Sequence, residues 1–189
     1  MTDTFPLLLS DDVIGLRRPE PSDGPGYHRM RNDLVTVEQL ISFNRGVSTA
    51  KVDEWIRGLG ERPDELVLTA VVPGEAHRPV GFIKVFNIDP LSGSCRLGLA
   101  LFDSAADGRK GYGGHMLTLL LRYLATSLRM RKVTLEVIDD NLPAMKLYLS
   151  HGFVEEGRLK DQYYIGGRFR TVVLMSKFLA REEAAHGLQ

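Results

Sequence analysis

The chain has 189 residues, 43% of them hydrophobic and 25% charged, which is the composition of an ordinary globular protein with one sizeable core. Lysine plus arginine and aspartate plus glutamate both number 24, so no net charge favours nucleic acid or an anionic membrane as partner. The start, MTDTFPLLLSDD, lacks the pattern of a signal peptide, and no apolar run is long enough for a membrane span. We therefore expect a cytoplasmic protein that binds neither nucleic acid nor membrane. A homodimer is one of the assemblies that we expect for it.

Cysteine and histidine usage limits the chemistry further. The single cysteine, Cys95, excludes an internal disulfide and fits a reducing compartment. It lies in the strand-like stretch SCRLGLALF, so we interpret it as buried filler and not as a nucleophile. The five histidines are scattered, with no two at metal-ligand spacing, and no metal site is expected.

The first third of the chain predicts one short strand and two helices. VIGLRR (13–18) alternates like a strand, and PEPSDGPG breaks it. Asp23 is the predicted cap of a helix near 24–34, and Ser48 or Thr49 is the predicted cap of a second helix through AKVDEWIRGL. The segment between these helices, including ISFNRGVST, is irregular.

Three strands and a glycine-rich turn follow. Stretches 65–72, 79–88 and 95–102, separated by turns near Pro73-Gly74 and at 89–93, predict an antiparallel meander. GRKGYGGH (108–115) then precedes an apolar helix whose leucines recur at one-face spacing. The turn has two readings: a flexible loop with solvated cations, or a cradle whose backbone amides and helix N-terminus hold an anion.

The last third predicts a strand, a helix and a hairpin. KVTLEVI (132–138) is a strand, and its helical connection from strand 95–102 predicts that the two run parallel. NLPAMKLYLSHG is a short helix capped by Asn141 and closed by Gly152. Gly166-Gly167 predicts a hairpin turn. We expect one domain over 1–189, with flexible ends at about 1–11 and 180–189.

Two motifs give the chain a family resemblance. RKGYGGHMLTLLLRY, followed thirty residues later by NLPAMKLYLSHGF, resembles the GCN5-related N-acetyltransferase (GNAT) family, in the branch of ribosomal-protein N-terminal and spermidine acetyltransferases. The resemblance implies an α/β (α+β) fold. Its central sheet would be mixed but mostly antiparallel, with about seven strands, a splayed parallel pair and about four flanking helices.

The resemblance also implies acetyl-coenzyme A as co-substrate, with no metal. Its pyrophosphate would lie on the amides of the glycine-rich turn, and its pantetheine arm would bond to backbone where the parallel strands separate. The residues expected to bind the coenzyme are Leu101, Phe102, Arg109, Lys110, Gly111, Tyr112, Gly113, Gly114, Asn141 and Lys146.

For the chemistry, the resemblance makes Tyr148 the expected proton donor to the departing sulfur. Arg96 stands where the family frequently has a glutamate, which leaves the general base open. Glu136 is the first candidate, Glu38 the second, and a water chain the third.

The expected activity is N-acetylation of a primary amine on a small molecule by direct attack in a ternary complex. Acetylation of a protein N-terminus is the alternative, and a non-catalytic coenzyme A-binding module is a further one. In this fold the first two helices and the last hairpin wall the acceptor side.

Overall fold

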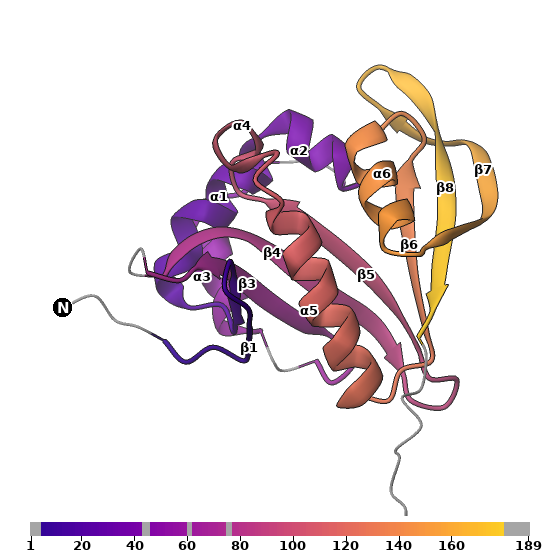
Figure 1. Ribbon diagram of the computed structural model, residues 1–189. Coiled ribbons are helices and arrows are strands. Elements are labelled where there is room, and N and C mark those ends of the chain that lie inside the picture. The colour runs from indigo at the N-terminus through magenta and orange to yellow at the C-terminus, as the bar shows by residue number, and fades with distance from the viewer. Residues whose placement is uncertain (1–4, 43–45, 60–61, 75–76, 180–189) are drawn as a thin grey trace, which may run out of the picture.

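The computed structural model describes residues 5–42, 46–59, 62–74 and 77–179, and these build one sheet with helices on both faces (Figure 1). Eight strands lie in the order β1-β2-β3-β4-β5-β6-β8-β7. They are β1 (Leu9–Ser10), β2 (Gly15–Arg17), β3 (Leu66–Val72), β4 (Arg78–Asp89), β5 (Ser94–Leu101), β6 (Lys132–Ile138), β7 (Val154–Ile165) and β8 (Arg168–Phe178). Neighbours are antiparallel except for β5 and β6, so the predicted mixed sheet with a parallel pair is confirmed.

The helices divide between the two faces of the sheet. They are α1 (Gly24–Asn32), α2 (Leu34–Gln39), α3 (Thr49–Arg57), α4 (Ser104–Asp107), α5 (Tyr112–Thr126) and α6 (Leu142–Ser150), with a short 3-10 turn at Pro21–Asp23. Buried leucines of α5 and Tyr148 of α6 join the larger core with one face of the strands. Tyr27 of α1 and Val52 of α3 join a smaller core with Phe82 on the opposite face.

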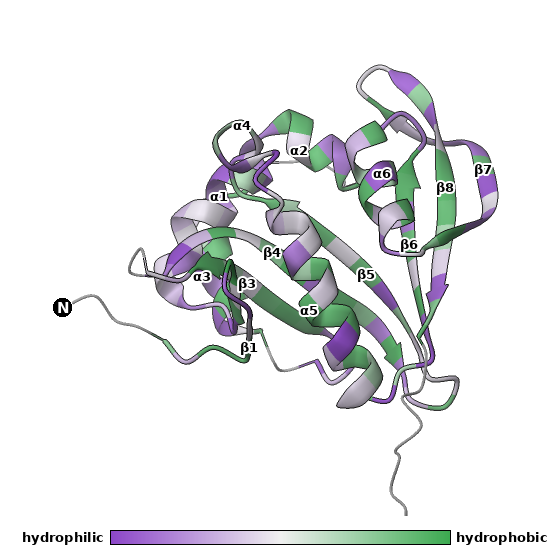
Figure 2. Cartoon of the chain, viewed as in Figure 1, coloured by the Kyte–Doolittle hydropathy of each residue, from purple (hydrophilic) through white to green (hydrophobic). Residues whose placement is uncertain are grey.

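Alternation along the strands creates these two cores. On β6, Val133, Leu135 and Val137 enter the larger core, while Thr134 and Glu136 face the other side. Figure 2 shows the resulting hydrophobic colour concentrated along the central strands and on α5. The face of the sheet that α1 and α3 cover has an apolar part, the smaller core, and a polar part that includes Thr134 and Glu136.

Several local expectations are confirmed. The strand predicted at 132–138 has those bounds, the Asn141 side chain accepts a hydrogen bond from the backbone N of Ala144, and Ser48 caps α3. Gly166 and Gly167 have the positive φ angles, 61° and 80°, that a tight hairpin turn favours.

Other expectations are wrong. Asp23 makes no side-chain cap hydrogen bond to α1, because its carboxylate binds Arg17 and Thr69 instead. Residues 9–10 pair with β2 as a strand, so this part of the predicted flexible start belongs to the sheet. The segment taken as irregular contains α2. The expectation of a flexible end at 180–189 is not among these, because it falls outside the described ranges.

Candidate active site at the separating strands

The two parallel strands are paired at only one end. Their register covers Ser94↔Lys132, Cys95↔Val133 and Arg96↔Thr134, whereas β5 continues to Leu101 and β6 to Ile138. The opening between residues 97–101 of β5 and 135–138 of β6 is called the splay below. It is the expected separation of the parallel pair.

Backbone groups of β5 line the splay. The carbonyl of Gly93 accepts from the backbone N of Lys132, while the backbone N of Phe102 donates 2.9 Å to the carbonyl of Val80 on β4. Because backbone groups alternate sides along a strand, odd-numbered residues of β5 face β6 and even-numbered ones face β4. Beyond Arg96, the groups facing the splay therefore come from Leu97, Leu99 and Leu101.

The alternation distinguishes two of the residues expected to bind the coenzyme. Leu101 faces the splay, whereas the N–H of Phe102 is engaged with β4, and the Phe102 ring lies 4.7 Å from the Tyr27 ring in the smaller core. Leu97 and Leu99, which the sequence did not single out, present their backbone groups to the same opening.

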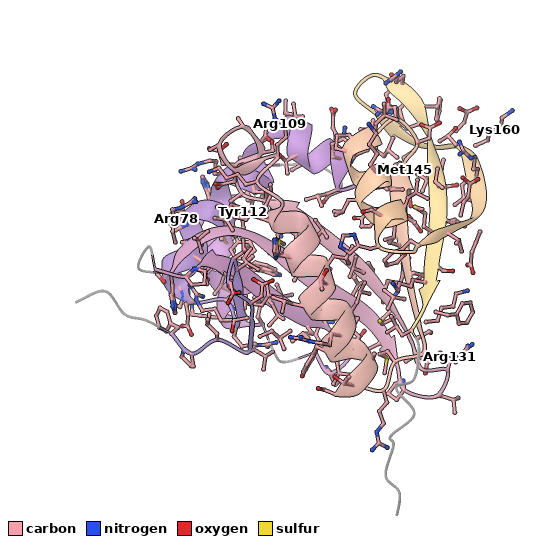
Figure 3. All side chains as sticks on the ribbon, in the orientation of Figure 1. Arg78, Arg109, Tyr112, Arg131, Met145 and Lys160 are labelled. Carbon is pink, nitrogen blue, oxygen red and sulfur yellow. The ribbon has the colours of Figure 1, made fainter. Side chains whose placement is uncertain are left out.

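The glycine-rich turn leads directly into α5. Gly111 is the N-cap of this helix with φ of 82°, a conformation that glycine adopts without strain, and Arg109 also has a positive φ, 62°. The first N–H groups of a helix have no partner within the helix, and their dipole favours an anion. Figure 3 shows Arg109 and Tyr112 at this end of α5.

The two cations of the turn differ in their partners. Arg109 is exposed, whereas the Lys110 Nζ lies 3.1 Å from the Oδ1 of Asp107. Asp107 is buried and also receives two hydrogen bonds, of 3.0 and 3.2 Å, from Arg78. Burial acts to raise the pKa of Asp107, but the hydrogen bonds and charges of Arg78 and Lys110 outweigh it and lower this pKa.

Gly113 and Gly114 have a packing role that the motif alone does not reveal. A Cβ built on Gly113 would lie 3.3 Å from Leu147 of α6, and one on Gly114 would lie 3.5 Å from His151. These glycines therefore let α6 approach the first turn of α5 closely. A substitution at Gly113 would disturb this helix contact as well as any bound anion.

Tyr148 lies on α6 with only 6% of its surface exposed, and its ring packs at 5.7 Å against the ring of Phe153. Burial raises the pKa of Tyr148 to about 12. The phenol therefore remains protonated and able to donate a hydrogen bond at any physiological pH. Asn141 and Lys146 are at the start and middle of the same helix, and Lys146 is exposed.

Glu136 lies on the opposite face of the sheet from Tyr148, at the start of the splay. Its Oε1 binds the Nη2 of Arg96 in an ion pair that links β6 to β5, and its Oε2 accepts from the hydroxyl of Tyr163 at 3.5 Å. Tyr163, on β7, was not anticipated from the sequence.

The surroundings of Arg96 form a polar stretch of the sheet, called the Arg96 face below and defined by Lys84, Phe86, Arg96, Gly98 and Glu136. Phe86 and Arg96 are cross-strand partners, as are Lys84 and Gly98. A Cβ built on Gly98 would meet nothing within 4 Å, so there is open space over this residue. This open position over Gly98, beside the splay, is called the hollow below.

The second candidate base is elsewhere. A Cβ built on Gly166 would lie 3.1 Å from the Oε2 of Glu38, so this α2 carboxylate contacts the turn between β7 and β8. The structure does not join it to Glu136 by any contact among the described residues. Instead, Glu38 brings α2 and the last hairpin together.

Remaining features carry no chemistry that the motifs indicate. Cys95 is buried, and burial raises its pKa to about 11, in agreement with a filler role. A cavity of about 610 Å³ between α3 and β3, lined by Trp55, Leu59 and Val67 among others, contains none of the predicted site residues.

Within the described ranges, no group of His, Cys, Asp or Glu side chains could hold a metal ion. None of the helices there is long and apolar enough to cross a membrane.

Comparisons with known proteins agree with this geometry. Residues 14–154 match the model of the acetyltransferase (GNAT) domain. The chain is 25% identical over 174 residues to an SPbeta prophage-derived uncharacterized N-acetyltransferase, YokL, of Bacillus subtilis, covering 92% of this chain and 94% of that protein. It is 31% identical over 108 residues to spermidine N(1)-acetyltransferase of Vibrio cholerae, covering 55% of this chain and 61% of that protein.

Solved structures share the fold. The crystal structure of spermidine N-acetyltransferase from Vibrio cholerae, in complex with CoA and spermine, superposes with a TM-score of 0.80 at 22% identity. The match covers 90% of this chain and 98% of that one. The family model spans most of the described sheet, including the splay and the glycine-rich turn, and the chain therefore belongs to the GNAT family and is an acetyl-CoA-dependent N-acetyltransferase.

Proposed function

We propose that this protein acetylates the primary amine of a small molecule, which attacks the thioester of acetyl-coenzyme A directly in a ternary complex. The observation that carries the proposal is the splay. At the splay the pairing of β5 and β6 stops, with Tyr148 on one face of the sheet and with Glu136 and the open space over Gly98 on the other. Donor and acceptor would thus approach one another through the sheet.

The donor side suits the coenzyme. The left-handed Gly111 and the N-terminus of α5 would form an anion site for the pyrophosphate, and Arg109 adds an exposed positive charge. The backbone groups of Leu97, Leu99 and Leu101 offer the pantetheine amides partners of the kind that a neighbouring strand would supply.

The acceptor side suits a small molecule better than a peptide. The contact of Glu38 with Gly166 brings α2 against the last hairpin, so these two walls of the acceptor side meet. A peptide N-terminus needs a groove that continues past such walls. The Vibrio cholerae structure was solved in complex with CoA and spermine, and its likeness in fold supports a small amine as the acceptor.

Glu136 and Tyr148 would have different roles in the reaction. As the N–C bond forms and the C–S bond breaks, the amine must lose a proton, and Oε2 of Glu136 is the oxygen placed to accept it directly or through water. The Tyr148 hydroxyl would stabilise the departing thiolate. With its pKa at about 12, it donates a hydrogen bond to a thiolate more readily than it gives up its proton.

The test is coenzyme A thiol release in the presence of acetyl-coenzyme A and a panel of amines, with polyamines, amino sugars, amino acids and N-terminal peptides. Small amines should support release, and peptides should not. Gly98→Val should abolish release by filling the hollow, while coenzyme A binding persists. Gly157→Val, at a strand glycine that also has open space, is the matched control and should stay active. Release with peptides alone would overturn the small-molecule proposal.

A further inference from the structure

We propose that the acceptor is an amine with an anionic group only a few bonds away, as in an amino acid, and that the Arg96–Glu136 pair recognises both charges together. This inference rests on the proposed function and names its substrate class. It arises from the charges around the hollow over Gly98.

Arg96 is held in place by contacts that leave most of its N–H donors available to a ligand. One nitrogen of its guanidinium, Nη2, binds Glu136, and the group lies 5.4 Å from the centroid of the Phe86 ring. A guanidinium has five N–H donors, and no other protein acceptor binds the Arg96 donors within the described ranges. With 36% of its side chain exposed, Arg96 presents oriented donors to the hollow. Such donors fit a carboxylate or phosphate.

A second cation borders the same space. The Nζ of Lys84 lies 4.7 Å from the centroid of the same Phe86 ring and 2.9 Å from the Oε1 of Glu65. Lys84 is the cross-strand partner of Gly98. Each of the two cations, Lys84 and Arg96, is paired with a carboxylate, so this face has no surplus negative charge that would attract a polycation such as a polyamine. A balanced pair of opposite charges fits an acceptor that itself has one charge of each sign.

Glu136 supplies the complementary charge. It is adjacent to the splay, where the reacting amine must lie, and it attracts an ammonium group. Because Arg96 and Glu136 are in direct contact, they match an ammonium and an anion that are themselves close neighbours. An acceptor with only one charge would bind either Arg96 or Glu136, but not both.

The experiment compares matched amines by kcat/KM for thiol release. Phenylalanine is tested against phenylalaninamide and phenylethylamine, which keep the amine and ring but lack the negative charge. O-phosphoethanolamine against ethanolamine separates phosphate from carboxylate, and spermidine is the polycation. We expect the anionic member of at least one pair to be preferred by roughly 10- to 100-fold, the effect of hydrogen bonds to a charged group.

Variants identify the residue responsible. Arg96→Gln should remove most of that preference through KM and leave coenzyme A binding unchanged, and Arg96→Glu should shift activity toward spermidine. Arg122→Gln, at an exposed arginine on α5, should behave like the wild type. Preference for the neutral or polycationic amines, or a preference that survives Arg96→Gln, would overturn this inference while leaving the acetyltransfer proposal intact. Acetylation of none of the amines would overturn both.

Discussion

The carboxylate of Asp23 accepts two hydrogen bonds of 2.8 Å from the guanidinium of Arg17, and both side chains are buried. Asp23 also accepts from the hydroxyl of Thr69, which in turn is 3.1 Å from the hydroxyl of Tyr27. These contacts join β2, β3 and α1, so the first helix is fixed to the sheet through a buried polar network. The α1–α3 side of the active site depends on it.

We predict that Asp23→Asn destabilises the protein by about 3–5 kcal/mol, because the buried Arg17 loses its counter-charge. The measurement is the free energy of unfolding in urea. Glu54→Gln removes one partner of the exposed Lys51–Glu54 ion pair and should change the stability far less, because solvent screens this pair. Equal losses in the two variants would contradict the burial argument.

Asp23 shows which contacts could not be predicted from the sequence. Local patterns predicted β6 at its bounds and the Asn141 cap, since alternation and caps depend on neighbours in the chain. Asp23 stands where a helix cap belongs, but its partners Arg17 and Thr69 come from two strands. Only the folded sheet brings a residue 46 positions away within hydrogen-bond distance.

In the glycine-rich turn, Lys110 has an ion-pair partner, Asp107, whereas Arg109 is exposed, and this difference gives a prediction. Arg109→Gln should weaken coenzyme A binding by roughly 2- to 10-fold, because an exposed charge near the helix N-terminus is lost. Lys110→Gln should have a smaller effect, since Asp107 already neutralises part of the Lys110 charge. Titration calorimetry at low and high salt measures both. A larger loss for Lys110→Gln would reassign the phosphate contact.

In the site too, features within one continuous segment were predicted, and contacts between residues far apart in the chain were not. The family motif located the glycine-rich turn and Tyr148, because both are encoded in continuous segments. It did not indicate that Arg96 binds Glu136, since these residues are 40 positions apart and meet across the parallel pair. Nor could it place Tyr163 near Glu136, because that contact depends on how β7 and β8 join the sheet.

Tyr148→Phe should leave coenzyme A binding intact and slow acetyl transfer by about 100-fold or more, because the departing sulfur loses its hydrogen-bond donor. The ring contact with Phe153 is kept, so the folded state should not suffer. Single-turnover kinetics measures the chemical step, and Tyr123→Phe on α5 is the control that removes a phenol elsewhere. An unchanged single-turnover rate would assign Tyr148 to packing alone.

Glu136→Gln should lower kcat most near neutral pH and progressively less as the pH rises. An alkyl amine with a pKa of about 10 arrives mostly protonated at neutral pH, so a missing base is felt most strongly there. Glutamine keeps an oxygen that can accept from Arg96, which limits damage to the link between β5 and β6. Glu38→Gln, at the carboxylate beside Gly166, tests the second candidate and should leave the pH profile of kcat unchanged. Should Glu38→Gln alone alter the profile, the base lies on α2. Should neither change it, the amine loses its proton through water, and Glu136 serves to hold Arg96.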